Sequence, residues 1–90
     1  MTERQHWEVI LTRQPERILR RLPGDLRRRI DERLRALADD PRPEGCKHLR
    51  AFDLYRLRVG DWRIIYSIVQ ERLVVLVVRI APRGGAYNDL

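Results

Sequence analysis

Residues 53–81 read DLYRLRVGDWRIIYSIVQERLVVLVVRIA, and this stretch decides the fold. It contains three segments of β-strand character, at residues 53–59, 61–68 and 72–81. Hydrophobic and polar residues alternate in the first two segments, and β-branched residues dominate the third. Gly60-Asp61 is typical of a two-residue hairpin turn, and Gln70-Glu71 predicts a second turn. The sequence therefore predicts a three-stranded antiparallel meander.

The Gly60-Asp61 turn fixes the register of the first hairpin, in which Arg58 faces Arg63. One face is then apolar and covers the helices; it is formed by Tyr55, Leu57, Val59, Trp62, Ile64 and Tyr66. The opposite face carries Arg56, Arg58 and Arg63. Like charges placed directly opposite each other are destabilising, and guanidinium groups match phosphate oxygens. This face is therefore a candidate phosphate-binding site, although a merely solvated basic face is an equally good interpretation of the alternation alone.

The segments upstream of the meander predict one strand and two helices. Residues 6–11 (HWEVIL) are rich in β-forming side chains. Thr12 is a candidate helix cap, Pro23-Gly24 separates the two helices, and the second helix ends near residues 39–41. Apolar residues recur at helical spacing, at Ile18, Leu19 and Leu22 and then at Leu26, Ile30, Leu34 and Leu37. Residues 42–51 are predicted to be a loop, and residues 82–90 an irregular tail. The fold class is α+β, with one small antiparallel sheet packed on two helices.

Length and composition exclude several classes of protein. Ninety residues, 43% of them hydrophobic, predict a single folded domain spanning residues 1–90. Cys46 is the one cysteine, so no intramolecular disulfide forms, and the chain has neither a signal-peptide pattern nor an apolar run long enough to span a membrane. His and Cys lack metal-ligand spacing. We therefore expect a cytoplasmic protein with no metal and no cofactor.

The net charge of +6 points to a polyanionic partner. Of 19 basic residues, all but Lys47 are arginine. The helical arginines are expected to be balanced by acids four residues away, as in Arg27 with Asp31 and Arg28 with Glu32. Residues 46–90 hold eight basic and four acidic side chains, so most of the unbalanced charge lies in the sheet half.

The C-terminal residues extend the candidate site. Arg83 follows the third strand, and Tyr87 comes four residues later, after Gly84-Gly85. If the third strand lies beside the second, its end returns to the region of Arg58 and Arg63. An aromatic side chain among arginines suits single-stranded nucleic acid, because the ring stacks on a base while the cations hold the backbone.

The segments YRLRVGDWRIIYSI (residues 55–68) and VVLVVRIAPRGGAY (residues 74–87) resemble the RelE/ParE superfamily of bacterial toxin–antitoxin pairs. Residues 19–43 resemble the family's helical hairpin, so the resemblance covers essentially the whole chain. It implies a toxin that a cognate antitoxin protein holds silent and, in the RelE-like branch, a ribosome-dependent endoribonuclease (mRNA interferase) that inhibits translation. The family's catalytic residues correspond here to Arg56, Arg58, Arg63, Arg83 and Tyr87. The resemblance also implies that Lys47, His48 and Arg50 are candidate RNA-binding residues.

The resemblance implies attack of a ribose 2′-hydroxyl on the adjacent phosphate, which needs no metal because the nucleophile belongs to the substrate. Arg58 and Arg63 would stabilise the transition state, but arginine is too basic to act as a general base. Many relatives also have a histidine where this chain has Pro82. Two alternatives therefore stay open: a toxin that inhibits DNA gyrase, as in the ParE branch, or acts by binding with a weakened nuclease, and an interaction module without chemistry.

Overall fold

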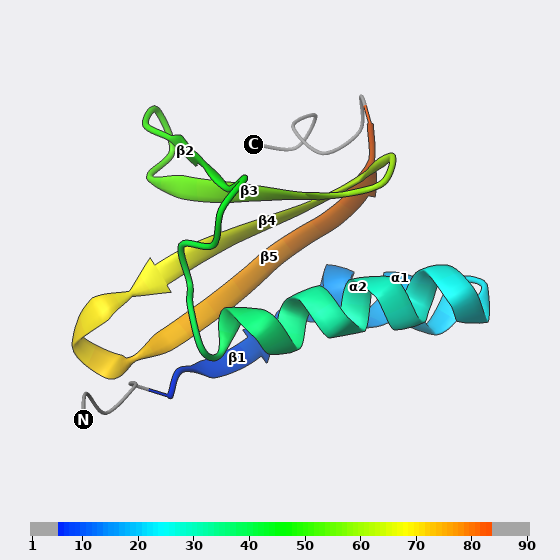
Figure 1. Cartoon of the computed structure of the whole chain (residues 1–90), viewed down its shortest axis with the longest axis horizontal. Coiled ribbons are helices and arrows are strands. Elements are labelled where there is room, and N and C mark those ends of the chain that lie inside the picture. Colours follow the sequence, from blue (N-terminus) through cyan, green and yellow to red (C-terminus); the bar gives the residue numbers. More distant parts are fainter. Residues whose placement is uncertain (1–5, 84–90) are drawn as a thin grey trace.

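The computed structural model describes residues 6–83 and shows two helices beside one five-stranded sheet (Figure 1). In chain order the elements are β1 (Glu8–Leu11), α1 (Arg13–Arg21), α2 (Gly24–Leu37), β2 (Lys47–Leu49), β3 (Leu54–Val59), β4 (Trp62–Val69), the 3₁₀ turn η1 (Gln70–Arg72) and β5 (Val74–Pro82). The α+β class is confirmed. No helix among residues 6–83 is long and apolar enough to cross a membrane.

The strand order is β1-β5-β4-β3-β2, so the predicted meander β3-β4-β5 forms the centre of a larger sheet. The expectation of a purely antiparallel sheet is wrong, because β1 pairs with β5 in parallel. The predicted loop over residues 42–51 is also wrong in part, because Lys47–Leu49 forms β2 against β3. A three-residue edge strand next to Pro and Gly is too short to show a period, which is why the pattern missed it.

The predicted register of the β3–β4 hairpin is confirmed. Arg58 pairs with Arg63, and Val59 pairs with Trp62 across the Gly60-Asp61 turn. The apolar face of this hairpin packs on the helices in one core, to which Leu57, Val59, Ile64 and Tyr66 contribute from the sheet and Leu19, Ile30, Leu34 and Leu37 from the helices. Burying these side chains on one face leaves Arg58 and Arg63 on the other.

The helices begin and end close to the predicted positions, but their charge pairs differ. Thr12 is the N-cap residue of α1, yet its hydroxyl donates to the carbonyl of Val77 at 2.9 Å instead of capping the helix. The expected pairs of Arg27 with Asp31 and Arg28 with Glu32 are not the ones found. Among the described residues, Asp31 pairs with Arg35 at 3.4 Å, and Arg28 lies 3.9 Å from Asp25. These pairs are well exposed, so each contributes little to the stability of its helix.

Candidate nucleic-acid interface

The register of the sheet arranges basic residues in two cross-strand rows. In the first row Lys47 pairs with Arg56, Arg56 with Ile65, and Ile65 with Arg79. In the second row, two residues closer to the turn, Arg58 pairs with Arg63 and Arg63 with Ala81. Side chains in paired positions point to the same face, and residues two apart along a strand do so as well. Both rows therefore lie on the face that the helices leave uncovered.

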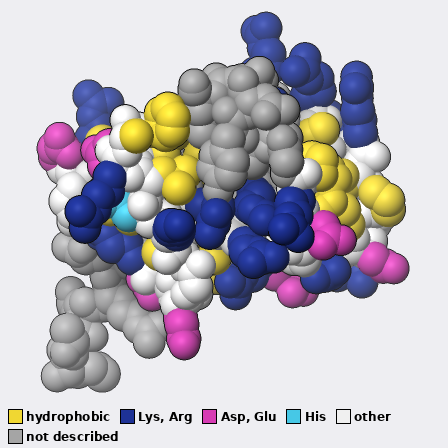
Figure 2. Space-filling view, turned by 90° about the horizontal axis from the view of Figure 1, so that it is seen from above, with side chains coloured by type: hydrophobic (Ala, Val, Ile, Leu, Met, Phe, Trp, Pro, Cys, Tyr) yellow, Lys and Arg dark blue, Asp and Glu magenta, His cyan; other side chains and the backbone are white. Residues whose placement is uncertain are grey.

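We call Arg56, Arg58, Arg63 and Arg79 the arginine cluster. The cluster surrounds a small apolar floor formed by Ile65 and Ala81, which are fully or nearly fully buried. In Figure 2, Lys and Arg side chains gather across the middle of the visible face, and acidic side chains lie towards its margins. A set of forked donors around an apolar floor can hold a phosphate and exclude water from it.

Arg63 is the member of the cluster with the most unusual environment. It is the one buried charged residue in the described part of the chain, with 8% of its surface exposed. Its Nη1 atom is buried and has no hydrogen-bond partner among residues 6–83. A buried donor without a partner costs about 1–3 kcal/mol, and the opposed Arg58 adds like-charge repulsion. An anion bound at this point would relieve both penalties.

The β3–β4 turn brings two more arginines to the same end of the sheet. The backbone N–H of Arg83 donates to the carbonyl of Asp61 at 2.7 Å, which fixes the end of β5 beside the turn. Gly60 has a φ of +59°, and a Cβ there would lie 3.2 Å from Nη2 of Arg29 on α2. The left-handed backbone favours glycine at this position, and the turn lies directly beside the side chain of Arg29.

The remaining predicted residues divide between the two faces. Lys47 joins the first row, and Arg50 is exposed in the turn after β2. His48, in contrast, stacks on Tyr55 with ring centroids 4.7 Å apart, and its Nε2 lies 3.0 Å from the carboxylate of Asp53. Because Tyr55 belongs to the helix-side face, the sheet separates His48 from the arginine cluster. Tyr87 lies outside the described residues.

Sequence reasoning missed Arg79 because of a β-bulge. Strict alternation along β5 places Arg79 on the same face as Val75 and Val77, which are both fully buried in the core. A register shift between Ile65 and Tyr66 inserts an extra residue in β5, and the side chains beyond it change faces. If the alternation of faces is counted backwards from Arg83, which contacts the β3–β4 turn, Arg79 falls on the face of the arginine cluster. If it is counted forwards from Val75 and Val77, Arg79 falls on the helix-side face.

Gln14 of α1 is a second residue that the sequence did not single out. Its amide donates to the carbonyl of Ile80 at 2.8 Å and accepts from the N–H of Ile80 at 2.9 Å. The side chain thus acts as a short strand partner for β5 beyond the end of β1. This pairing holds the segment of β5 that carries Arg79 and leads to Arg83.

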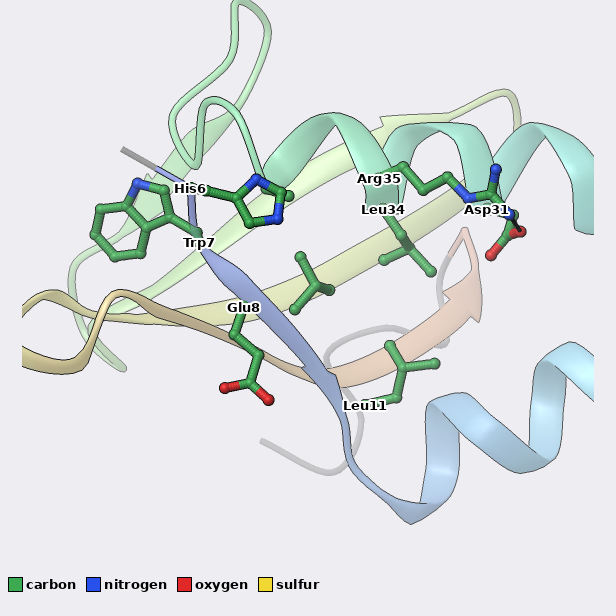
Figure 3. Close-up of a pocket in the computed structure, with 9 residues that line it drawn as sticks. His6, Trp7, Glu8, Leu11, Asp31, Leu34 and Arg35 are labelled. Atoms are coloured by element: carbon green, nitrogen blue, oxygen red, sulfur yellow. Dashed lines mark ion pairs between the residues drawn. The ribbon is translucent and has the colours of Figure 1, made fainter. Parts of the chain in front are cut away.

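A separate hollow lies at the other edge of the sheet, between β1 and α2 (Figure 3). Its volume is about 470 Å³, and its walls include Val9 and Leu11 from β1 and Leu34 and Ala38 from α2 or its end. One strand, β5, separates β1 from the β3–β4 hairpin, but the lining residues from α2 place the hollow on the helix side of the sheet. The hollow is therefore not part of the arginine cluster, which lies on the opposite face; its rim also carries the polar side chains of His6, Glu8, Asp31 and Arg35.

Comparison with known proteins agrees with this fold. The model of the family described as "ParE toxin of type II toxin-antitoxin system, parDE" matches residues 9–87. The chain is 28% identical over 75 residues to the putative toxin RelE1 of Methanocaldococcus jannaschii, covering 79% of this chain and 83% of that protein. It is 29% identical over 66 residues to the mRNA interferase toxin RelE of Escherichia coli, covering 71% and 70% of the two chains.

A solved structure gives the same result. The structure of the archaeal RelE-RelB complex from Pyrococcus horikoshii superposes with a TM-score of 0.71 and 28% identity, covering 90% of this chain and 99% of that one. The chain therefore belongs to the RelE/ParE superfamily of toxins and, within it, to the family of ParE toxins of type II toxin–antitoxin systems. The resemblance noted in the sequence is thereby confirmed.

Proposed function

We propose that this toxin is a ribosome-dependent mRNA endoribonuclease that inhibits translation. The observation that carries the proposal is the buried Arg63, opposed by Arg58 and lacking a partner for its Nη1 among the described residues. Such a site suits an anionic ligand, which would pair with the two guanidinium groups. The curated relative from E. coli is named an mRNA interferase, which favours RNA as the source of that anion.

The proposed reaction is an internal transfer at phosphorus. The 2′-oxygen of a ribose attacks the adjacent phosphate while the bond from phosphorus to the 5′-oxygen of the next nucleotide breaks. The products are a 2′,3′-cyclic phosphate and a free 5′-hydroxyl, so the 2′-hydroxyl loses a proton and the 5′-oxygen gains one. Arg58 and Arg63 stabilise the charge that accumulates on the phosphate oxygens, and Arg83 lies beside the leaving oxygen.

Proton transfer has to come from outside the arginine cluster. Arginine stays protonated at any physiological pH, so Arg56 and Arg58 donate hydrogen bonds but do not accept a proton. His48 lies on the other face of the sheet, and Pro82 stands where many relatives have a histidine. We propose that Tyr87 or a ribosomal RNA group assists, and that the ribosome enforces the in-line geometry.

We further propose that a cognate antitoxin protein binds this toxin and silences it. The solved relative from P. horikoshii is a complex of RelE with RelB. An acidic antitoxin would neutralise the excess positive charge of the chain. Strand β1 is at the edge of the sheet, with Ile10 39% exposed, so an antitoxin strand could add there.

Substitution of Arg63 tests the proposal in cells. We expect Arg63→Ala to abolish growth arrest and mRNA cleavage while antitoxin binding is retained. Arg72→Ala is the matched control, because Arg72 is an exposed arginine in η1, at the opposite end of β4. Growth arrest that survives Arg63→Ala, accompanied by loss of DNA supercoiling, would contradict the nuclease and identify gyrase as the target.

A further inference from the structure

The turn between β2 and β3 exposes an aromatic side chain. Phe52 is 51% exposed, and together with Ile10 it makes up the pair of exposed large hydrophobic residues in the described part of the chain. The two lie at opposite edges of the sheet, because Ile10 belongs to β1 and Phe52 follows β2. Covering this ring with a ligand would be favourable, because the ligand would remove apolar surface from water.

The conformation of the turn is fixed by hydrogen bonds. The N–H of Phe52 donates to the carbonyl of Leu49 at 3.1 Å, and the N–H of Asp53 donates to the carbonyl of Arg50 at 3.4 Å. Asp53 takes a left-handed conformation, with a φ of +52°, and its carboxylate contacts His48 across the hairpin. The turn therefore holds Phe52 out of the core by its backbone geometry.

The surroundings of Phe52 are basic. Arg50 is an exposed residue of the same turn, and Lys47 is exposed on β2. Asp53 is the one acidic residue between residues 46 and 60, and its carboxylate is engaged by His48. An aromatic ring flanked by cations fits a nucleobase with its phosphates and disfavours a basic or neutral partner.

The turn is continuous with the arginine cluster. Lys47 pairs with Arg56, so the first basic row extends from β3 onto β2. Phe52 lies in the turn two positions before β3 begins and six positions before Arg58, so the two residues are at most roughly 20 Å apart along the chain. In Figure 1 the β2–β3 connection lies at the end of the sheet away from α1 and α2, where no helix obstructs it. A single RNA strand can therefore cross both sites, several nucleotides apart.

We propose that Phe52 is a stacking platform for an unpaired base of the same RNA strand whose phosphate is bound by the arginine cluster. Arg50 and Lys47 hold the phosphates that flank this base. The inference rests on the proposed function for its substrate class, and it adds a second RNA contact remote from the scissile bond. This contact raises the affinity for RNA and takes no part in the chemical step.

The test compares three variants in two assays. Phe52→Ala removes the ring, Phe52→Tyr keeps a ring that stacks, and Ile10→Ala removes the other exposed hydrophobic side chain. One assay measures the Kd of a 5′-fluorescein-labelled single-stranded 12-nucleotide RNA at 50 mM salt. The other measures kcat and KM for mRNA cleavage on programmed ribosomes. Circular dichroism confirms that each variant folds.

We expect Phe52→Ala to raise the Kd and KM about tenfold with kcat unchanged, because stacking of a base on an aromatic ring contributes on this scale. Phe52→Tyr and Ile10→Ala should behave as the unmodified protein. Equal Kd and KM values for Phe52→Ala and the unmodified protein, with cleavage intact, would overturn the inference but leave the nuclease standing. RNA binding that depends on Phe52 without any cleavage would support the inference and refute the nuclease. A protein that binds no RNA in either assay would refute both.

Discussion

Arg63 lies in a position where protein stability and the proposed RNA binding make opposite demands. The sheet buries its guanidinium group beside an apolar floor and opposite Arg58, and Nη1 has no partner among residues 6–83. A side chain chosen for stability alone would be aliphatic at this position. Such unfavourable residues persist where the strain serves binding or catalysis.

Replacing Arg63 by leucine should therefore stabilise the protein and inactivate it. We expect Arg63→Leu to raise the free energy of unfolding by about 1–2 kcal/mol, because the buried charge is replaced by an apolar side chain. Urea denaturation measures the change. Arg72→Leu, at an exposed position, should change the unfolding free energy by less than about 0.5 kcal/mol. A less stable Arg63→Leu protein would show that the guanidinium contributes to folding and is not held available for a ligand.

Tyr66 should make the stability fall at high pH. It is fully buried, and its hydroxyl donates to the carbonyl of Pro41 at 2.8 Å. Burial, with a contribution from the neighbouring Cys46, raises the pKa of Tyr66 well above that of a free phenol. The unfolded chain then loses this proton near pH 10 while the folded chain keeps it, so the stabilisation is complete below pH 10 and is lost above it.

Urea denaturation at pH 9 and pH 11 checks this dependence. We expect Tyr66→Phe to be less stable by about 1 kcal/mol at pH 9, because a buried hydrogen bond is lost. Between the two pH values its unfolding free energy should fall less than that of the unmodified protein. An equal fall in both proteins would mean that Tyr66 ionises in the folded state as it does in the unfolded one.

At the scale of elements, β5 carries Arg79 of the candidate site and leads to Arg83. It pairs with β1 on one side and β4 on the other, and its last residues are held by Gln14 and by the Asp61 carbonyl. The side chain of Gln14 takes the place of a strand partner for Ile80. Without it, the N–H and carbonyl of Ile80 lose their partner in a partly buried environment.

Gln14→Ala should therefore cost about 1–3 kcal/mol of unfolding free energy, since two backbone groups lose their hydrogen bonds. Hydrogen exchange should show faster exchange at the amide of Ile80 than in the unmodified protein. Gln70→Ala, in the exposed η1 turn, is the control and should leave both measurements unchanged. If the Ile80 amide stays equally protected in Gln14→Ala, the side-chain pairing does not hold the end of β5.

The elements also show how far sequence reasoning reaches. The Gly60-Asp61 turn determined the β3–β4 register, and with it the opposition of Arg58 and Arg63, because a two-residue turn leaves no freedom in the pairing. Strand β2 and the bulge opposite Ile65 were not predictable in this way. A three-residue edge strand shows no periodicity, and a bulge depends on packing between strands that are distant in the sequence. Arg79 was missed for that reason, and the role of Tyr87 rests on the resemblance alone.

At the scale of the whole molecule, the arginines lie in two different environments. The arginines of α1 and α2 are mostly exposed, and some pair with acids one turn away. In the arginine cluster, Arg58 directly faces Arg63, and Arg56 and Arg79 lie on either side of Ile65. We infer that RNA binding depends on where the cations lie as well as on the net charge of +6.

The salt dependence of RNA binding separates these two contributions. For single-stranded RNA, each phosphate that a cation neutralises contributes about 0.7 to the slope of log Kd against log salt concentration. Arg58→Ala should lower the slope by about this amount, whereas Arg20→Ala on α1 should leave it unchanged. Equal losses from the two variants would mean that the charge acts diffusely, without a defined site.

Primer extension on a defined mRNA shows directly whether this toxin cuts messages on the ribosome. The purified protein is incubated with the message alone and with the same message in a reconstituted translation system. We expect cuts in the translated message only, in register with its codons, and none with the Arg63→Ala variant. An uncut message under both conditions, from protein that still arrests growth, would contradict the assignment of this toxin as a ribosome-dependent nuclease.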